Sequence, residues 1–312
     1  MTDDRAVAEG FLADLDRNDA IAVEAWFTPE ATWWVDTGRD RAAGVEGHDP
    51  GDERPWPLHG TMPGRPKARL LQGLPERFPD GVRQRAWKTV GHGPWVVVEV
   101  EGDGVYVDGT PYRNRYAFVV EVVDGLVATV REYLDTLHAA SVFAARGIDR
   151  RTEAEVAVPA GVAAATDQGR VALAFITAIM AADLDAFRTL FTDDATWWSD
   201  SGTDRDAGRH DVIQPPARHP FHGRIAIADK LAAMRGIDRA FPDGLTLHTR
   251  RLIEDGDTVA VEVFGDAEHR SGRRYQNRAV FVLEVTDGRV AAVREYCDTL
   301  HVADLFGIDV PV

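Results

Sequence analysis

An internal repeat that runs through almost the whole chain places the strongest constraint on its fold. Residues 131–138 read REYLDTLH and residues 294–301 read REYCDTLH, so only one position of the eight differs. Farther upstream, EATWWVDTG at 30–38 corresponds to DATWWSDSG at 194–202. Corresponding positions are 163 or 164 residues apart, whereas solenoid repeats have periods of about 20–50 residues. The repeat therefore predicts two similar domains in tandem.

The limits of the two domains follow from the extent of the repeat. The sequence between the copies is rich in alanine and contains Pro159 and Gly161, a composition typical of a linker. We therefore expect a first domain at 1–149, a linker at 150–167 and a second domain at 168–312.

Both copies show the same pattern of predicted helices and strands. In the first copy, apolar residues at helical spacing over 3–25, interrupted at Asn18-Asp19, predict two helices. A short strand at ATWW, a long loop rich in glycine, proline and aspartate, and a helix follow; the helix is expected at 66–77, and at 225–239 in the second copy. Runs of β-branched and aromatic residues then predict strands at 83–90, 95–101, 112–123 and 126–134.

The chain after these runs carries two local signals. The segment VVDGLV predicts an Asp-Gly hairpin between the last two strands, and Asp135 is expected to cap a C-terminal helix. The whole order predicts an α+β fold of two cone-shaped domains. In each, a curved antiparallel sheet wraps around the N-terminal helices and leaves a blind pocket between helices and sheet.

Composition excludes several classes of function. The formal net charge is −16, so a phosphate backbone or an anionic membrane surface is not expected as a partner. A single cysteine, Cys297, excludes internal disulfides and a cysteine-based zinc site, and the histidines lack metal-ligand spacing, so no metal is expected. Neither a signal peptide nor a run of about 18 apolar residues is present, and a cytoplasmic location is expected.

The motifs ATWW, Y-x-N-R and F-V-x-E-V-x-D-G-x-V-x-x-V-R-E-Y-x-D-T occur in both copies. Together with the order of elements, they resemble the SnoaL-like and ketosteroid-isomerase-like group of the nuclear-transport-factor-2-like superfamily. That superfamily includes isomerases, aldol-type cyclases, dehydratases, epoxide hydrolases and non-catalytic binding domains, so the resemblance implies a fold rather than a reaction. Its members commonly form homodimers sheet to sheet. The tandem is therefore expected to form a pseudo-dimer within one chain, either as a monomer or as a homodimer.

The ending V-R-E-Y-x-D is similar to the W-R-D-Y-F-D ending of limonene-epoxide-hydrolase-like enzymes. This resemblance implies that Glu132 and Glu295 are general bases acting on water. It also implies that Glu99 and Glu262 are the partner carboxylates, although valine or alanine stands where those enzymes have an arginine two residues earlier.

Ketosteroid isomerases offer a second set of candidates. Their catalytic aspartate lies three residues after the threonine of an A-T run, a place held here by Val35 and Ser199. Asp36 and Asp200 come one residue later, and a shift of one residue turns a side chain to the other face of a strand unless a bulge intervenes. We expect both aspartates at the pocket mouth, as catalytic groups or as turn-forming residues.

The carboxylates can also be placed by the alternation of side chains along strands. Glu132 falls on the face opposite to Arg131 and Tyr133. Glu99 lies among valines, where an ionised carboxylate is costly to bury unless it is paired. If Glu99 and Glu132 face each other in the pocket, one can serve as base and the other as acid. The alternative is that each pairs with an arginine.

Further candidates surround these acids. His59 and His222 end the long loop and are expected to transfer protons at the pocket mouth, or else to anchor the loop. Replacement of Tyr116 by Ala279 in the second copy would enlarge the pocket if this position faces inward. Aromatic and amide side chains are expected to contact a ligand: Trp33, Trp34, Tyr112, Asn114, Tyr116, Tyr133, Trp197, Trp198, Tyr275, Asn277 and Tyr296. The alternative is that the aromatic side chains pack and that Asn114 satisfies a bend of the backbone.

These residues favour a cofactor-independent enzyme of the cyclase, isomerase or hydrolase type. It would act on a small, mostly apolar metabolite through carboxylate acid–base chemistry. The main alternative is a non-catalytic protein that binds a small molecule in the same pockets, and a third is an interaction scaffold that uses an exposed sheet. Two carboxylates, or a carboxylate and a histidine, that converge inside an enclosed cavity would favour the enzyme. A cavity whose polar groups are all neutralised by arginine or backbone partners would favour the binding protein, and a filled cavity with a large exposed apolar patch would favour the scaffold.

Overall fold

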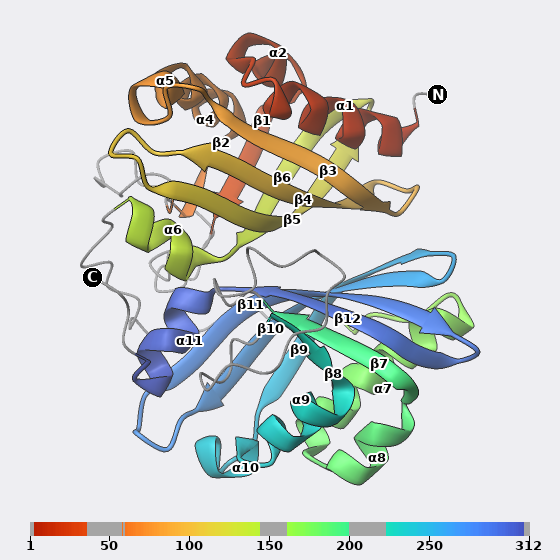
Figure 1. The fold of residues 1–312 in the computed structure, drawn as a ribbon. Helices are drawn as coiled ribbons and strands as arrows, with labels where there is room; N and C mark the ends of the chain where they lie inside the picture. Colours follow the sequence, from red (N-terminus) through yellow and green to blue (C-terminus); the bar gives the residue numbers. More distant parts are fainter. Residues whose placement is uncertain (1–2, 36–57, 59, 144–160, 200–222, 309–312) are drawn as a thin grey trace. The chain divides into compact units, whose positions relative to one another are not determined.

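The computed structural model describes residues 3–35, 58, 60–143, 161–199 and 223–308 of the 312-residue chain. These residues form two compact units, one in each half (Figure 1). We call residues 3–143 the first domain and residues 161–308 the second domain. Most of the predicted linker at 150–167 lies outside the described residues.

The first domain begins with helices, continues with a sheet and ends with a short helix. Its elements, in chain order, are α1 Asp4–Asp16, α2 Ala20–Ala25, β1 Phe27–Val35, β2 Gly60–Pro63, α4 Gly64–Leu70, the 3-10 helix η1 Leu71–Gly73, α5 Leu74–Arg77, β3 Val82–Val90, β4 Trp95–Val105, β5 Pro111–Val123, β6 Leu126–Leu134 and α6 Thr136–Val142.

The second domain repeats this order with small differences in length. Its elements are α7 Asp167–Ala181, α8 Leu184–Thr189, β7 Phe191–Ser199, β8 Gly223–Ala226, α9 Ile227–Met234, α10 Ile237–Ala240, β9 Thr246–Asp255, β10 Thr258–Glu268, β11 Arg274–Thr286, β12 Arg289–Cys297 and α11 Thr299–Phe306. The α+β fold and the duplication predicted from the sequence are therefore confirmed, and the predicted strands appear close to their expected limits.

The sheets differ from the prediction in one pairing. Their strand orders are β2-β1-β6-β5-β4-β3 and β8-β7-β12-β11-β10-β9. All neighbours are antiparallel except β1 with β6 and β7 with β12, which are parallel. Each sheet is thus mixed rather than purely antiparallel. Alternation along a sequence reveals a strand but not its neighbour, and the short strands β2 and β8 are too brief to show alternation at all.

Local signals explain where several elements begin and end. The Asp135 and Asp298 carboxylates accept hydrogen bonds from backbone N–H groups at the start of α6 and α11, as the sequence predicted for the first copy. Asp124 and Gly125 both have positive φ, 52° and 77°, which is the geometry of the predicted Asp-Gly hairpin. Between α1 and α2, Asn18 has φ 57°, and its side chain exchanges hydrogen bonds of 3.0 and 3.1 Å with the backbone of Val82 in β3.

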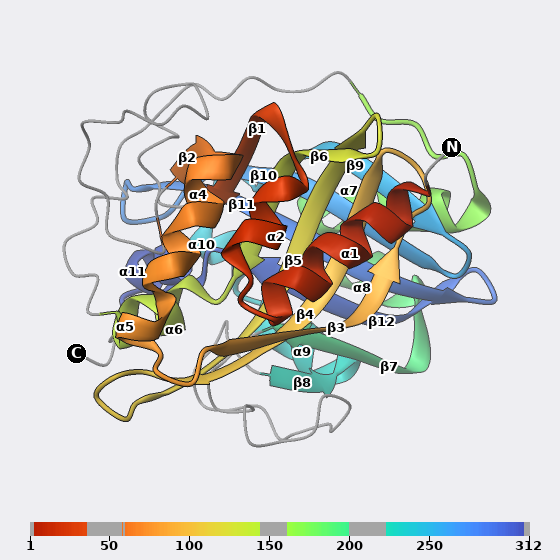
Figure 2. The ribbon, with the colours of Figure 1, turned by 90° about the horizontal axis from the view of Figure 1, so that it is seen from above.

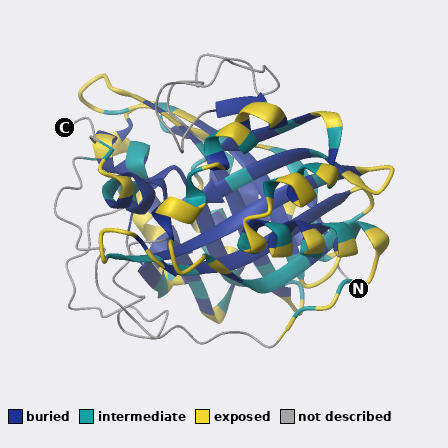
Figure 3. Cartoon of the chain, turned by 90° about the horizontal axis from the view of Figure 1, so that it is seen from below, coloured by how far each residue is buried: buried dark blue, intermediate teal, exposed yellow. Residues whose placement is uncertain are grey.

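Helices cover one face of each sheet, which we call the inner face. In Figure 2, α1, α2 and α4 lie across the first sheet. In the second domain, Phe175 of α7 packs against three rings of the sheet's inner face at centroid distances of 5.4–6.1 Å: Phe191, Trp197 and Phe281. Burial of each such ring contributes about 1.5–3 kcal/mol. Figure 3 shows that buried residues follow the strands, whereas exposed residues concentrate on helices and turns.

Candidate functional site

The candidate site lies on the inner face of the second domain, where β7 and β12 run side by side. Their pairing brings Trp197 of β7 next to Val293 of β12, two residues before Glu295. The following antiparallel pair, Phe281 with Glu295, extends the same face onto β11. Helix α9 contacts β7 and contributes Lys230 from its buried side.

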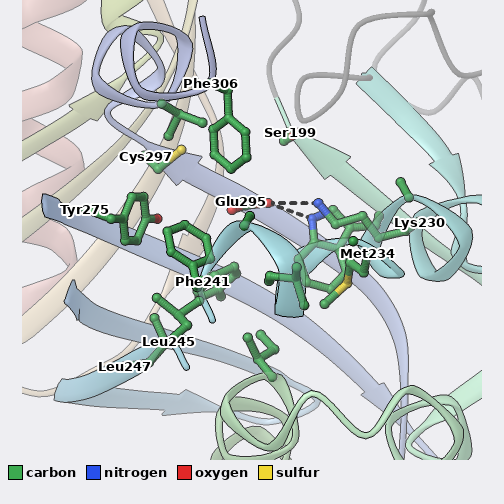
Figure 4. Close-up of a pocket in the computed structure, with 18 residues that line it drawn as sticks. Ser199, Lys230, Met234, Phe241, Leu245, Leu247, Tyr275, Glu295, Cys297 and Phe306 are labelled. Carbon is green, nitrogen blue, oxygen red and sulfur yellow. Dashed lines mark hydrogen bonds and ion pairs between the residues drawn. The ribbon is translucent and has the colours of Figure 1, made fainter. Parts of the chain in front are cut away.

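Three side chains interact closely at this point. The indole Nε1 of Trp197 donates a hydrogen bond of 2.9 Å to Oε2 of Glu295. The ammonium of Lys230 lies 3.4 Å from the same oxygen and 4.4 Å from the centroid of the Trp197 ring (Figure 4). We call these three residues the second-domain triad. Both donors approach one oxygen, and within the described part of the chain no hydrogen bond reaches Oε1 of Glu295.

The first domain holds the same three residue types at corresponding positions. Trp33 Nε1 donates a hydrogen bond of 2.8 Å to Oε2 of Glu132, and Lys67 Nζ lies 5.4 Å from the centroid of the Trp33 ring. Burial raises the pKa of Glu132, opposed by the charge of Lys67 and the Trp33 hydrogen bond. Burial also lowers the pKa of Lys67 to about 8, opposed by the charge of Glu132. We call Lys67, Trp33 and Glu132 the first-domain triad.

A cavity of about 230 Å³ opens beside the second-domain triad. Most of its wall is apolar and includes Met234, Phe241, Leu247, Phe281 and Phe306. The described residues give it few polar groups: Trp197, Ser199, Lys230, Tyr275, Glu295 and Cys297. The side chain of Glu295 is 21% exposed, which leaves its carboxylate accessible from the cavity. An apolar chamber with a few converging polar groups is the usual form of a small-molecule site.

The corresponding cavity of the first domain measures only about 40 Å³. The ring of Tyr116 lines it, stacks on Phe118 at 5.5 Å and bonds through its hydroxyl to the Tyr112 hydroxyl at 2.8 Å. In the second domain this position is Ala279, whose strand partner is the cavity-lining Cys297. The loss of this aromatic side chain is therefore one contribution to the difference in volume between the two cavities.

Residues 172–293, which make up most of the second domain, match the family model described as "SnoaL-like domain". The second domain is a SnoaL-like domain. The first domain has the same strand order, the same motifs and the same triad. The chain is thus a tandem duplication whose second copy matches the SnoaL-like model, in agreement with the repeated sequence motifs.

Solved structures similar to the chain each correspond to about half of it. AclR from Streptomyces galilaeus, a proposed hydroxylase, shares 19% identity over 47% of this chain and 88% of its own, with a TM-score of 0.36. IdmH from Streptomyces antibioticus, a proposed polyketide cyclase, shares 20% identity over 46% and 99%, with a TM-score of 0.37. A proposed isomerase from Bacillus subtilis shares 18% over 46% and 94%, with a TM-score of 0.37. No curated protein sequence matches the chain.

The expected meeting of Glu99 with Glu132 does not occur in the first domain. Glu132 pairs with Phe118 across the sheet, whereas Glu99 pairs with Ala117 one residue away, so the two carboxylates lie on opposite faces. The same holds in the second domain, where Glu262 forms an ion pair with Arg251 of the neighbouring strand. Glu99 and Glu262 are therefore not partners of the inner-face acids.

Four of the predicted ligand-binding aromatics also lie on the outer face. The guanidinium of Arg131 lies 4.5 Å from the centroid of the Trp34 ring, and Trp34 packs against Tyr133 at 5.3 Å. Trp198 and Tyr296 pack in the same way at 5.1 Å. These rings alternate with the inner-face residues along their strands, so Trp34, Tyr133, Trp198 and Tyr296 do not line the cavities.

The two candidate asparagines hold the backbone rather than face the cavity. The Asn114 side chain donates to the Asp135 carbonyl oxygen and accepts from the Asp135 N–H, both at 3.1 Å. Asn277 makes the corresponding bonds with Asp298 at 3.3 and 3.2 Å. Each asparagine thus closes the bend between a strand and the C-terminal helix, the alternative considered from the sequence.

The remaining candidates divide into two groups. Tyr112, Tyr116 and Trp33 line the small cavity of the first domain, and Trp197 and Tyr275 line the large cavity of the second. The other four candidates, Asp36, His59, Asp200 and His222, lie outside the described residues.

Lys67 and Lys230 are the site residues that the sequence reasoning missed. A usable signal was present, because only three of the 35 basic residues are lysines: Lys67, Lys88 and Lys230. Two of these three occupy corresponding positions, each seven residues after the glycine of a His-Gly pair. Among the described residues there is no cluster of three or more His, Cys, Asp or Glu side chains suited to a metal ion, and none of the helices is long and apolar enough to cross a membrane.

Proposed function

We propose that the second domain binds a small, mostly apolar molecule and that Glu295 acts on it as a general base in a cofactor-independent reaction. The reaction would be of the cyclase, isomerase or hydrolase type. The observation that carries this proposal is the 230 Å³ apolar cavity. Among the described residues that line it, Glu295 supplies the only carboxylate, which Trp197 and Lys230 contact.

The triad provides what a general base in an apolar cavity requires. The Trp197 N–H fixes the orientation of the carboxylate, and the Lys230 ammonium offsets the cost of keeping a negative charge in apolar surroundings. Because both contacts are made to Oε2, Oε1 is directed to a proton of the bound molecule. The hydroxyl of Tyr275 faces the same cavity and can donate a hydrogen bond to a carbonyl or enolate oxygen (Figure 4).

The first domain supports the assignment as an internal comparison. It keeps the carboxylate, the indole and the amine, yet its cavity of about 40 Å³ leaves no room for a metabolite. We therefore assign the proposed activity to the second domain alone.

The experiment begins with native mass spectrometry of the purified chain, to find a molecule that co-purifies with it. Turnover of that molecule is then measured for Glu295→Gln and for the matched control Glu132→Gln. Loss of a general base typically lowers the rate by about 10²–10⁴, so Glu295→Gln should lose at least a hundredfold and Glu132→Gln should keep the wild-type rate. Equal rates for all three proteins would exclude Glu295 as the base.

A non-catalytic binding domain is the second candidate, and one observation favours it. The Lys230 ammonium already neutralises the Glu295 carboxylate, as expected for a site that only holds a ligand. In that case the co-purifying molecule would bind to wild-type protein and leave it chemically unchanged. Glu295→Gln would then alter its dissociation constant without any effect on product formation.

A further inference from the structure

The use of lysine in this chain is highly selective. Three lysines stand against 32 arginines, and two of the three are the amines of the triads. Both are buried, with Lys230 7% and Lys67 4% exposed, whereas Lys88 on strand β3 is partly exposed. All other lysine-or-arginine positions in the chain are occupied by arginine.

Arginine and lysine differ most in the chemistry of their nitrogen atoms. A guanidinium stays protonated in proteins and is a poor nucleophile, whereas a lysine amine that has passed its proton to a neighbouring base can attack a carbonyl carbon. Lys230 lies in an apolar cavity, against an indole face and 3.4 Å from a carboxylate oxygen that can accept its proton. An arginine would supply the charge for that ion pair but not the nucleophile.

We propose that Lys230 is a nucleophilic amine that forms an imine with an aldehyde or ketone group of the molecule bound in the second domain. This inference rests on the proposed function, since it requires that the cavity hold a ligand. It adds a chemical class for that ligand: a small apolar carbonyl compound.

The step balances with the groups present in the triad. The Lys230 ammonium transfers a proton to Glu295 Oε2, and the resulting amine attacks the carbonyl carbon, so that a C–N bond forms. Glu295 returns this proton to the carbonyl oxygen, which becomes a hydroxyl group. Glu295 then accepts a second proton from the nitrogen and passes it to that hydroxyl, so that the C–O bond breaks and water leaves. The product is a C=N bond to Lys230, with one water released and no oxidant or metal required.

Reductive trapping on the full-length chain tests this directly. The protein is incubated with benzaldehyde and sodium cyanoborohydride, and the benzyl adduct is located by peptide mass spectrometry. Because the chain has only three lysines, the assignment is unambiguous. Binding in the cavity raises the local concentration of the aldehyde, so Lys230 should be labelled on the order of tenfold or more faster than Lys88. Lys67 serves as the matched internal control and should remain unlabelled.

Two variants and a competing ligand serve as controls for the labelling of Lys230. Ala279→Tyr, which fills the cavity, and Lys230→Arg, which keeps the charge, should both abolish the fast labelling. Benzyl alcohol has no carbonyl group and should slow labelling of Lys230 by competing for the cavity. If benzyl alcohol binds beside Trp197 but Lys230 is labelled no faster than Lys88, the imine proposal is wrong. If Lys230 is labelled no faster than Lys88 and benzyl alcohol also fails to bind beside Trp197, both the imine proposal and the proposed function are wrong.

Discussion

Lys67 is buried inside the first domain, beside the indole ring of Trp33 and near the carboxylate of Glu132. Its pKa falls to about 8 because the ammonium loses its hydration there. In the unfolded chain the pKa returns to its ordinary value of 10.5. The folded first domain therefore binds this proton more weakly than the unfolded chain does, and its stability depends on pH.

The sign of the pH effect follows from this difference. Below pH 8 both states are protonated at Lys67, and the cost of burying the charge is present in full. Between pH 8 and 10.5 the folded state releases the proton first, so the free energy of unfolding should rise. At about 1.4 kcal/mol per pKa unit, the gain is up to about 3 kcal/mol.

Urea denaturation at several pH values, compared between wild type and Lys67→Met, measures this gain. The methionine variant has no amine at this position, so the part of the pH dependence that belongs to Lys67 should be absent from it. If both proteins change stability equally between pH 8 and 10, the burial cost assigned to Lys67 is wrong.

At the scale of elements, the strand-to-helix bend of each domain depends on one buried asparagine. Asn114 joins β5 to the residue that caps α6, and Asn277 does the same between β11 and α11. Both side chains are 1% exposed, so the backbone groups they serve have no access to water. A buried polar group left without a partner costs about 1–3 kcal/mol.

Asn114→Ala should therefore destabilise the chain by about 2–4 kcal/mol, since two backbone groups of Asp135 lose their partner at once. The neighbouring substitution Arg113→Ala, at a side chain 48% exposed, should change stability by less than about 0.5 kcal/mol. Thermal and urea unfolding of both variants measure these two changes in stability. Equal stability of the two variants would show that the bend does not depend on the asparagine.

Elements that depend on neighbouring residues were predictable from the sequence. The helix caps at Asp135 and the Asp124-Gly125 hairpin need only a few adjacent side chains, and both occur where expected. The parallel pairing of β1 with β6 was not predictable, because it joins segments about a hundred residues apart whose alternation patterns suit either direction.

The residues of the candidate site were likewise only partly predictable from the sequence. Glu132 and Glu295 could be singled out from the motif that contains them, and both lie on the inner face with an indole partner. Glu99 could not be placed, because a register difference of one residue decides its face and that register is set across three strands. Lys67 and Lys230 come from helices distant in sequence from the acids, and only their recurrence among very few lysines indicated a role.

At the scale of the whole molecule, duplication has produced two domains of one topology and unequal cavities. Strand order, caps, bends and triads agree between the copies. Several residues that line one of the cavities differ from their counterparts in the other copy: Tyr116 and Gln84 of the first cavity correspond to Ala279 and Leu247, and Cys297 of the second cavity corresponds to Leu134. We therefore propose that ligand binding belongs to the second domain and that the first domain has a structural role.

Xenon uptake in crystals of the full-length chain tests this assignment most directly, because xenon enters apolar cavities of about 150 Å³ without any specific chemistry. In the wild-type protein, xenon should occupy the second domain beside Trp197 and Phe281 and be absent from the first. Tyr116→Ala should add a site next to Phe118, and Ala279→Tyr should remove the one in the second domain. Xenon in the first domain of the wild-type protein, or a second domain that takes up none, would contradict the account.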